Sequence, residues 1–250
     1  VEGSVAALMD WVYGFFMAWG MFLAIPCPLK LWRESARDKM LCCLPLVGGV
    51  VGGVWALAAY LAGFLPAPVG AVLVAAAPWL TTGFLHLDGF MDVCDAVLSR
   101  RDLAVRQRIL KDSHCGAFAV ICMVLLALCQ WSVAMAGAAV WLPSLVLIPM
   151  AARCCASLAV LTLRPMTGSQ YAAMSHRAVG CMAFPAAVLA ASVAAPLLLW
   201  HSFAPLASAL GYALALWYAY RQLDGMSGDI SGFALTLGEL CGLTILVLVR

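Results

Sequence analysis

The chain has 250 residues, of which 65% are hydrophobic and only 10% are charged, and its mean hydropathy is +1.01. Soluble domains contain about 25% charged and about 45–50% apolar residues, so this composition excludes an ordinary soluble protein and indicates a polytopic membrane protein. The formal net charge of +2 provides no strong basic field, and we expect no nucleic-acid partner.

The predicted fold class is all-α, a membrane-embedded helical bundle formed as a single domain over residues 1–250. Because a helix needs about 20 residues to cross a bilayer, the length permits about seven or eight transmembrane helices. The apolar runs are continuous and do not alternate, which argues against a β-barrel. In chain order the runs cover residues 5–25, 41–65, 69–85, 117–136, 142–163, 182–200, 203–220 and 232–249. The first run contains Asp10 and is the weakest.

Basic residues concentrate in four connections between these runs. Twelve of the fourteen Lys and Arg residues lie in residues 29–40, 96–114, 164–177 and 221–231. Under the positive-inside rule these connections face the cytoplasm, which predicts a multi-pass protein of the cytoplasmic (inner) membrane with the lipid bilayer as a partner. The same connections carry aspartates, so we expect the active site to face the cytoplasm.

Five of the twelve acidic residues lie in one stretch, Thr81–Asp112. On a helix, Asp88, Asp92 and Asp95 fall at about 0°, 40° and 340°, which places three carboxylates on one face. Such carboxylates repel one another unless a cation lies between them, and magnesium or manganese prefers carboxylate oxygens. The stretch therefore predicts a metal site, with a solvated acidic face as the alternative. Gly89 is expected to let a ligand or metal approach the backbone closely.

A second polar segment, Arg108–Gly116 (RILKDSHCG), precedes the run at residues 117–136. Lys111 is a candidate for holding a phosphate group, and Asp112 for completing the metal shell. The alternative is an interfacial lysine followed by a helix N-cap at Asp112 or Ser113.

A third segment, Gly225–Gly232 (GMSGDISG), is a glycine-rich turn at the start of the last run. Asp229 is a candidate metal ligand. The backbone amides of the turn around Ser227 and Gly228, together with the helix N-terminus, are candidates for binding phosphate oxygens.

Two charged residues, Arg153 and Glu239, lie inside predicted spans. An intramembrane charge is a functional candidate by default. Mutual pairing and contact with a substrate both remain open for these two residues.

Together the three segments resemble the adenosylcobinamide-GDP ribazoletransferase (cobalamin synthase) family. Gly83–Asp95 (GFLHLDGFMDVCD) is similar to the family's His-x-Asp-Gly-x-x-Asp-x-x-Asp segment, Arg108–Gly116 resembles its basic-Asp-Ser…Gly segment, and Gly225–Gly232 is similar to its Gly-x-Thr-Gly-Asp-x-x-Gly turn. Weaker similarity covers residues 22–28 and 45–53. The sequence departs from the family pattern at Phe84 and Phe233, where small residues are usual, at Ser227 in place of threonine, and at Asp224 in place of glycine.

The resemblance implies a magnesium-dependent membrane transferase. It would join the 5′-hydroxyl of α-ribazole, or α-ribazole 5′-phosphate, to the cobinamide phosphate of adenosylcobinamide-GDP, release GMP and form adenosylcobalamin or its 5′-phosphate. The expected Mg²⁺ ligands are Asp88, Asp92, Asp95 and Asp229. The expected catalytic residues are Asp88, Asp92, His86 and Lys111, and the expected binding residues are Asp112, Ser113, Ser227 and Gly228. A homo-oligomer and contacts with other corrin-assembly enzymes are further expectations.

Three other functions remain open on the sequence. A CDP-alcohol phosphotransferase and an intramembrane prenyltransferase also bind a diphosphate through aspartates, but their full motifs are absent from this chain. From a different class, an ion-coupled transporter would use the aspartates for coupling. Transporter sites usually lie near the bilayer midplane, whereas these aspartates cluster at connections between the runs.

Overall fold

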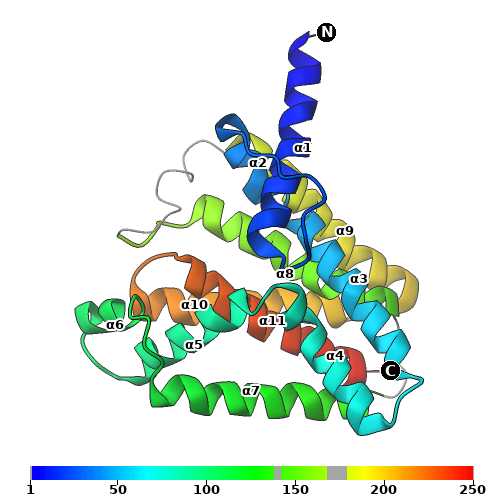
Figure 1. The fold of residues 1–250 in the computed structure, drawn as a ribbon, viewed down its shortest axis with the longest axis vertical. Coiled ribbons are helices and arrows are strands. Elements are labelled where there is room, and N and C mark those ends of the chain that lie inside the picture. The colour runs from blue at the N-terminus through cyan, green and yellow to red at the C-terminus, as the bar shows by residue number, and fades with distance from the viewer. Residues whose placement is uncertain (1, 138–141, 168–178, 250) are drawn as a thin grey trace.

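The structure is a computed structural model that describes residues 2–137, 142–167 and 179–249. These residues contain eleven α-helices (Figure 1). The eight long apolar helices are α1 (Glu2–Phe22), α3 (Leu44–Ala62), α4 (Ala67–Thr81), α7 (Ala117–Ala136), α8 (Leu142–Thr162), α9 (Ala183–Trp200), α10 (Ala204–Leu223) and α11 (Gly228–Leu248). The short helices are α2 (Arg37–Cys42), α5 (Leu85–Leu98) and α6 (Leu103–Ile109), together with 3₁₀ turns at Glu34–Ala36 and Val179–Cys181. Each of the eight predicted apolar runs is therefore confirmed as a helix.

In the described residues, fewer helices qualify as membrane spans than the seven or eight expected from the sequence. Five helices (α3, α7, α8, α9 and α11) are long and apolar enough to cross a membrane, and the bent pair α4 and α5 makes a sixth if it counts as one span. Alone, α4 has only 15 residues, which is too short for a crossing. In α10, the C-terminal half carries Trp217, Tyr218, Tyr220 and Arg221, which lower its hydropathy. The polytopic helical bundle itself is confirmed.

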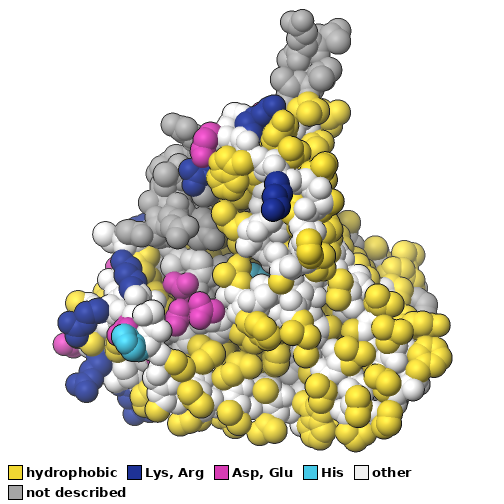
Figure 2. Space-filling model, in the orientation of Figure 1, with side chains coloured by type: hydrophobic (Ala, Val, Ile, Leu, Met, Phe, Trp, Pro, Cys, Tyr) yellow, Lys and Arg dark blue, Asp and Glu magenta, His cyan; other side chains and the backbone are white. Residues whose placement is uncertain are grey.

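Burial separates the central helices from the peripheral ones. In α8 and α11 two thirds of the candidate span, 67%, is buried inside the protein, whereas in α7 and α9 only 17% is buried. The outer faces of α7 and α9 are therefore the surfaces left for lipid. In Figure 2 many charged side chains gather over α6 and the neighbouring helix ends, and a smaller group lies near α1 and α2, while the surface over α7 and α4 is mostly hydrophobic.

A sharp bend of 90° separates α4 from α5. Gly83 and Phe84 form the bend, and both have left-handed backbone angles, with φ of 60° and 64°. The amide of Phe84 donates a hydrogen bond to the carbonyl of Trp79 (2.9 Å), which closes the end of α4. Asp224, at the end of α10, is also left-handed, with φ of 56°. Phe84 and Asp224 thus replace residues that suit this conformation better, because a side chain with a Cβ disfavours positive φ.

Helices α5 and α11 cross with their backbones in contact. A Cβ atom at Gly89 would lie 2.8 Å from the Cα of Asp229, and one at Gly232 would lie 3.1 Å from the carbonyl oxygen of His86. Beside the crossing, the rings of Phe90 and Phe233 stack with centroids 5.6 Å apart. The expectation that Gly89 admits a ligand or metal is wrong, because the backbone of α11 fills that space. Phe233 replaces a small residue and gains this ring partner.

The carboxylate of Asp95 joins α5 to the start of α7. It is 9% exposed and accepts hydrogen bonds from the backbone amides of Gly116 and of Ala119 (2.9 Å for the latter). The first amides of a helix lack partners within the helix and carry partial positive charge, so a carboxylate there is stabilising. Neither Asp112 nor Ser113 caps α7, which corrects that alternative.

We predict that Gly89→Ala destabilises the protein, because the added methyl group would overlap the backbone of Asp229 and force α5 away from α11. Overpacking of this kind costs about 1–3 kcal/mol. Thermal unfolding in detergent measures the effect. Gly53→Ala is the matched control, since Gly53 is also inside a helix but a methyl group added there would have nothing within 4 Å. Equal stability of the two variants would contradict the backbone contact.

We also predict that Asp95→Asn lowers the melting temperature by a few degrees, because its amide group would oppose one of the two backbone N–H donors, at a cost of about 1–3 kcal/mol. Asp102→Asn is the control, since Asp102 precedes α6 without making a side-chain cap hydrogen bond. An unchanged melting temperature for Asp95→Asn would refute its role at the start of α7.

Candidate active site

A cavity of about 590 Å³ lies among α5, α8 and α11. Residues of α1, of the α2–α3 segment and of the loops at one end of the bundle also line it. Its polar lining residues are His86, Asp88, Lys111, Arg153, Thr167, Ser227, Asp229 and Ser231. Its apolar lining comes mainly from Met21, Phe22, Leu41, Leu44, Leu85, Leu110, Val160, Met166 and Leu235.

Residues of three of the four basic connections line this cavity, and the remaining connection, at residues 29–40, ends next to it. Leu41 directly follows the connection at residues 29–40, Lys111 belongs to the second, Thr167 to the third and Ser227 to the fourth, and all four residues line the cavity. Residues 168–178 of the third connection lie outside the described residues. That all four connections face the cytoplasm stays a prediction.

The carboxylates of Asp88 and Asp229 face the cavity from different helices. The contact of Gly89 with the backbone of Asp229 places them on adjoining turns. The Asp88 carboxylate is exposed and has no hydrogen-bond or ion-pair partner among the described residues, whereas the Asp229 carboxylate is half-buried and accepts a hydrogen bond from Ser227 (3.3 Å). Asp92, one turn further along α5, is half-buried and interacts electrostatically with both, although it does not line the cavity.

A metal fits this donor set only together with a substrate. Within the described residues, no three His, Cys, Asp or Glu side chains are grouped closely enough to form a complete metal site. Magnesium, however, usually takes one or two protein carboxylates and obtains its other ligands from water and substrate phosphates. Asp88, with no competing partner, and Asp229 provide such a pair. The Asp95 carboxylate, also on α5, instead accepts hydrogen bonds from the backbone amides at the start of α7, and Asp95 does not line the cavity.

Three of the groups expected to bind phosphate, Lys111, Ser227 and Gly228, line the same cavity. The Lys111 ammonium donates a hydrogen bond to the carbonyl oxygen of Thr167 (3.2 Å). Ser227 is the N-cap of α11 and accepts a hydrogen bond from the amide of Ile230 (3.3 Å). Because serine keeps the hydroxyl of threonine, this departure from the family pattern preserves the cap. Ser227 and Gly228 also present the positive end of α11 to the cavity.

A second, shallower hollow adjoins the cavity at Lys111, which lines both. Arg108, Asp112 and Ser113 line the hollow but not the cavity. Asp112 accepts a hydrogen bond from the amide of His114 (3.0 Å) and contacts its ring, and these contacts hold the pKa of the Asp112 carboxyl below its ordinary value. The structure therefore separates Asp112 and Ser113 from the carboxylate pair.

The outer wall of the cavity is held by contacts that the sequence did not reveal. The amide of Met166 donates to the carbonyl of Met226, and the amide of Met226 donates to the carbonyl of Arg164, both at 2.9 Å. Arg164 also pairs with Asp224. These contacts fasten the segment after α8 to the turn before α11. Phe22 lines another wall of the cavity. In the sequence, the weak similarity of residues 22–28 to the family was the only indication that this segment lies near the site.

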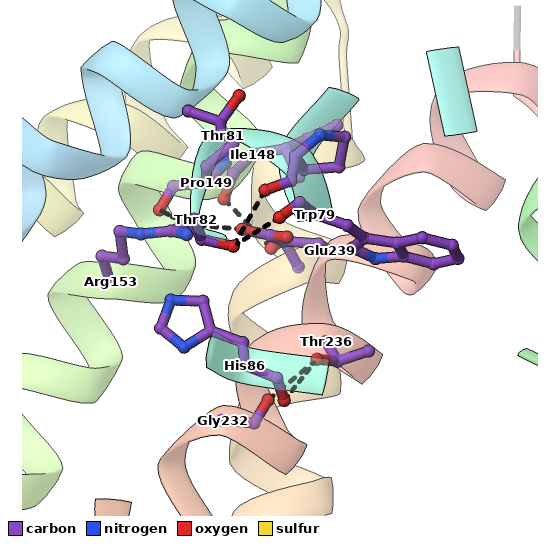
Figure 3. Close-up of polar contacts among 12 residues, drawn as sticks. Trp79, Thr81, Thr82, His86, Ile148, Pro149, Arg153, Gly232, Thr236 and Glu239 are labelled. Carbon is purple, nitrogen blue, oxygen red and sulfur yellow. Dashed lines mark hydrogen bonds and ion pairs between the residues drawn. The ribbon is translucent and has the colours of Figure 1, made fainter. Parts of the chain in front are cut away.

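A buried ion pair lies beside the cavity at Arg153 (Figure 3). We call this buried end of the cavity its inner end and the end at the exposed Asp88 its outer end. Arg153 of α8 pairs with Glu239 of α11, and the two residues are only 1% and 5% exposed. Pairing, one of the two roles left open for these residues, is therefore confirmed. Figure 3 shows the His86 ring beside the Arg153 side chain, and the hydroxyl of Thr236 donates to the His86 carbonyl (3.3 Å).

Comparison with known proteins shows the family of the chain. Residues 14–247 match the family model described as cobalamin-5-phosphate synthase. The chain is 33% identical over 241 residues to an adenosylcobinamide-GDP ribazoletransferase of Clostridium botulinum (strain Alaska E43 / Type E3), and the alignment covers 92% of this chain and 95% of that protein. A protein of the same name from Geobacillus kaustophilus (strain HTA426) is 29% identical over 90% of this chain and 92% of its own length.

No solved structure matches the chain significantly. The family model nevertheless spans all three polar segments and nearly all of the helices described above. The chain belongs to the cobalamin-5-phosphate synthase family.

Proposed function

We propose that this chain is an adenosylcobinamide-GDP ribazoletransferase that acts in cobalamin biosynthesis. The family assignment and the names of its relatives support this activity. The observation that carries the proposal is the meeting of Asp88, Asp229 and Lys111, each from a different polar segment, at one cavity. The family assignment also favours this activity over the CDP-alcohol phosphotransferase, prenyltransferase and transporter alternatives.

In the proposed reaction, a hydroxyl oxygen of α-ribazole attacks the phosphorus that is attached to cobinamide. A new phosphorus–oxygen bond forms, the bond that joins this phosphorus to GMP breaks, and GMP leaves with the electron pair. The hydroxyl proton passes to a base. The product is adenosylcobalamin, or its 5′-phosphate when α-ribazole 5′-phosphate is the acceptor.

The family description changes one detail of the expected chemistry. A cobalamin 5-phosphate product keeps the phosphate of its acceptor. An acceptor whose 5′ position already carries phosphate has no free 5′-hydroxyl and must attack through another ribose oxygen. We therefore replace the expected 5′-hydroxyl with a secondary ribose hydroxyl as the proposed nucleophile.

We propose that Asp88 and Asp229 hold Mg²⁺, with Asp92 as a further ligand or as a support for the first two. When bound, the ion would neutralise charge on the diphosphate oxygens. Asp95 stays a predicted ligand, but each oxygen of its carboxylate already accepts a hydrogen bond from a backbone amide at the start of α7. Lys111 is the cation that stabilises the departing phosphate, because its ammonium can exchange the Thr167 carbonyl at the rim for a phosphate oxygen.

The geometry favours an aspartate over His86 as the base. Residues two apart on a helix point about 200° away from each other around its axis, so the His86 ring and the Asp88 carboxylate diverge. The His86 ring, whose Nε2 is buried, lies beside Arg153 (Figure 3), whereas the Asp88 side chain is exposed and that of Asp229 is half-buried. One of the aspartates, and not His86, is therefore our proposed base.

Lys111 also indicates where the nucleotide lies. Because it borders both the cavity and the adjoining hollow, a diphosphate at Lys111 would leave the GMP part over the hollow lined by Arg108, Asp112 and Ser113. Phosphate oxygens facing the cavity would meet the N-terminus of α11 at Ser227 and Gly228.

We propose that this opening faces the cytoplasm, because the basic connections surround it. The inner membrane as the location, a homo-oligomer and contacts with other corrin-assembly enzymes stay predictions.

The test is an assay of GMP release by the purified protein with adenosylcobinamide-GDP and α-ribazole, with Mg²⁺ or with a chelator. We expect release to require Mg²⁺ and to fall at least about 100-fold in Asp88→Asn and Asp229→Asn, because each loses a charge placed for the reacting phosphate. Asp102→Asn, outside the cavity, is the control. Near-normal, chelator-resistant turnover in both variants would rule out the proposed metal site, and no release by the unchanged protein would rule out the function.

A further inference from the structure

Two buried side-chain nitrogens at the inner end of the cavity have no hydrogen-bond partner among the described residues. They are Nη2 of Arg153 and Nε2 of His86, from α8 and α5. Both residues line the cavity. The pairing of Arg153 with Glu239 uses Nη1, which leaves the two N–H groups of Nη2 without an acceptor. Burying such a donor is unfavourable, so its position beside a cavity indicates that a ligand supplies the missing acceptor.

The neutral Arg153–Glu239 pair at this end favours an uncharged hydrogen-bond acceptor in the ligand. Glu239 already neutralises Arg153, and both are almost fully buried. A phosphate or carboxylate placed here would therefore be repelled by Glu239 as well as attracted by Arg153, in a medium of low dielectric constant. A neutral group that accepts a hydrogen bond meets neither difficulty. The anionic parts of the substrates fit the outer end, where Lys111 and the proposed metal site lie.

The walls of the cavity between its two ends indicate the shape and polarity of the ligand group that would bind there. They are formed by the apolar side chains of Phe22, Leu44, Val160 and Leu235 and by the small residues Ala156 and Gly232. Along α11, ten residues separate Asp229 from Glu239, which corresponds to about 15 Å from the outer end to the inner end. The volume of about 590 Å³ is in the range that holds small organic ligands.

We propose that the inner end of this cavity binds the benzimidazole base of α-ribazole and that Arg153 donates a hydrogen bond from Nη2 to the unsubstituted ring nitrogen of that base. This inference rests on the proposed function and adds the orientation of the acceptor and a residue that determines base specificity. Once one nitrogen carries the ribose, benzimidazole is a flat, largely apolar bicycle with a single in-plane acceptor. The base then lies among the apolar walls and the ribose extends toward Asp88 and Asp229, where its hydroxyl must react.

The first test uses the unaltered protein and two acceptors. The indole analogue of α-ribazole has CH in place of the ring nitrogen, so it keeps the shape and loses the acceptor atom. We expect its KM in the GMP-release assay to be about tenfold higher or more, because a site built around a hydrogen bond leaves its donor unpaired with such an analogue. Equal KM values for the two acceptors would overturn the inference while leaving the proposed function intact.

The second test compares the two acceptors in Arg153→Lys. Lysine keeps a cation beside Glu239 but has a single side-chain nitrogen. It therefore cannot pair with Glu239 through one nitrogen and donate to the base through another, as Arg153 does with Nη1 and Nη2. We expect the KM for α-ribazole to rise about tenfold and the KM values for the indole analogue and for adenosylcobinamide-GDP to change little. A rise that is equal for both acceptors, or one confined to adenosylcobinamide-GDP, would show that Arg153 does not contact the base.

A third variant covers the case in which Arg153→Lys does not fold. Arg153→Met/Glu239→Leu removes both charges, and replacing a whole buried pair with apolar residues is often tolerated, whereas removing one partner is not. Thermal unfolding checks its fold. We expect it to bind α-ribazole no better than the indole analogue, measured as ligand-induced thermal stabilisation without the second substrate. Retained preference for α-ribazole would overturn the inference.

Discussion

The direct contact between the backbones of α5 and α11 determines the rest of the site. Gly89 and Gly232 lie at the crossing, and neither position has room for a side chain without moving the partner helix. Because the helices touch, Asp88 and Asp229 lie beside the same cavity although they are far apart in the sequence. The stacked rings of Phe90 and Phe233 add a second contact across the same crossing.

Charges are sorted by depth along the cavity. At the outer end, Asp88 lacks a partner among the described residues and Lys111 binds only a backbone carbonyl, so both are free to meet ions and phosphates. At the inner end, Arg153 and Glu239 neutralise each other. This order follows from the cost of a charge inside a membrane, which is high unless the charge is paired or reaches water. The same order separates the proposed diphosphate chemistry from the proposed binding of a neutral base.

The departures from the family pattern have local structural explanations. Phe84 and Asp224 occupy left-handed positions at the ends of helices, where glycine or a small residue is less strained. Asp224 also pairs with Arg164, which fastens the loop beside the cavity. Phe233 stacks on Phe90. None of these changes alters a carboxylate that faces the cavity, so they modify the scaffold around the site and leave its donor groups in place.

The sequence by itself determined the class of the protein, its eight apolar helices and the three polar segments, because these depend on composition, periodicity and local spacing. It also placed Asp88, Asp92 and Asp95 on one face of a helix. It did not show that Asp95 meets α7, because seven residues along a helix are about 10 Å apart, enough for two residues on one face to meet different neighbours. Nor did hydropathy reveal the bend at Gly83 and Phe84, which ends α4 after 15 residues, too few for a span by itself.

Only the tertiary structure decided which polar residues share a cavity and which serve the scaffold. Asp88 and Asp229 came together through a crossing that no local pattern encodes, and Gly89, expected to admit a ligand, instead admits α11. The pairing of Arg153 with Glu239 was decided in the same way. The reason is physical: a hydrogen-bond donor is satisfied or left unpaired by groups from other helices, and contacts between distant helices are not contained in the spacing of residues along one of them.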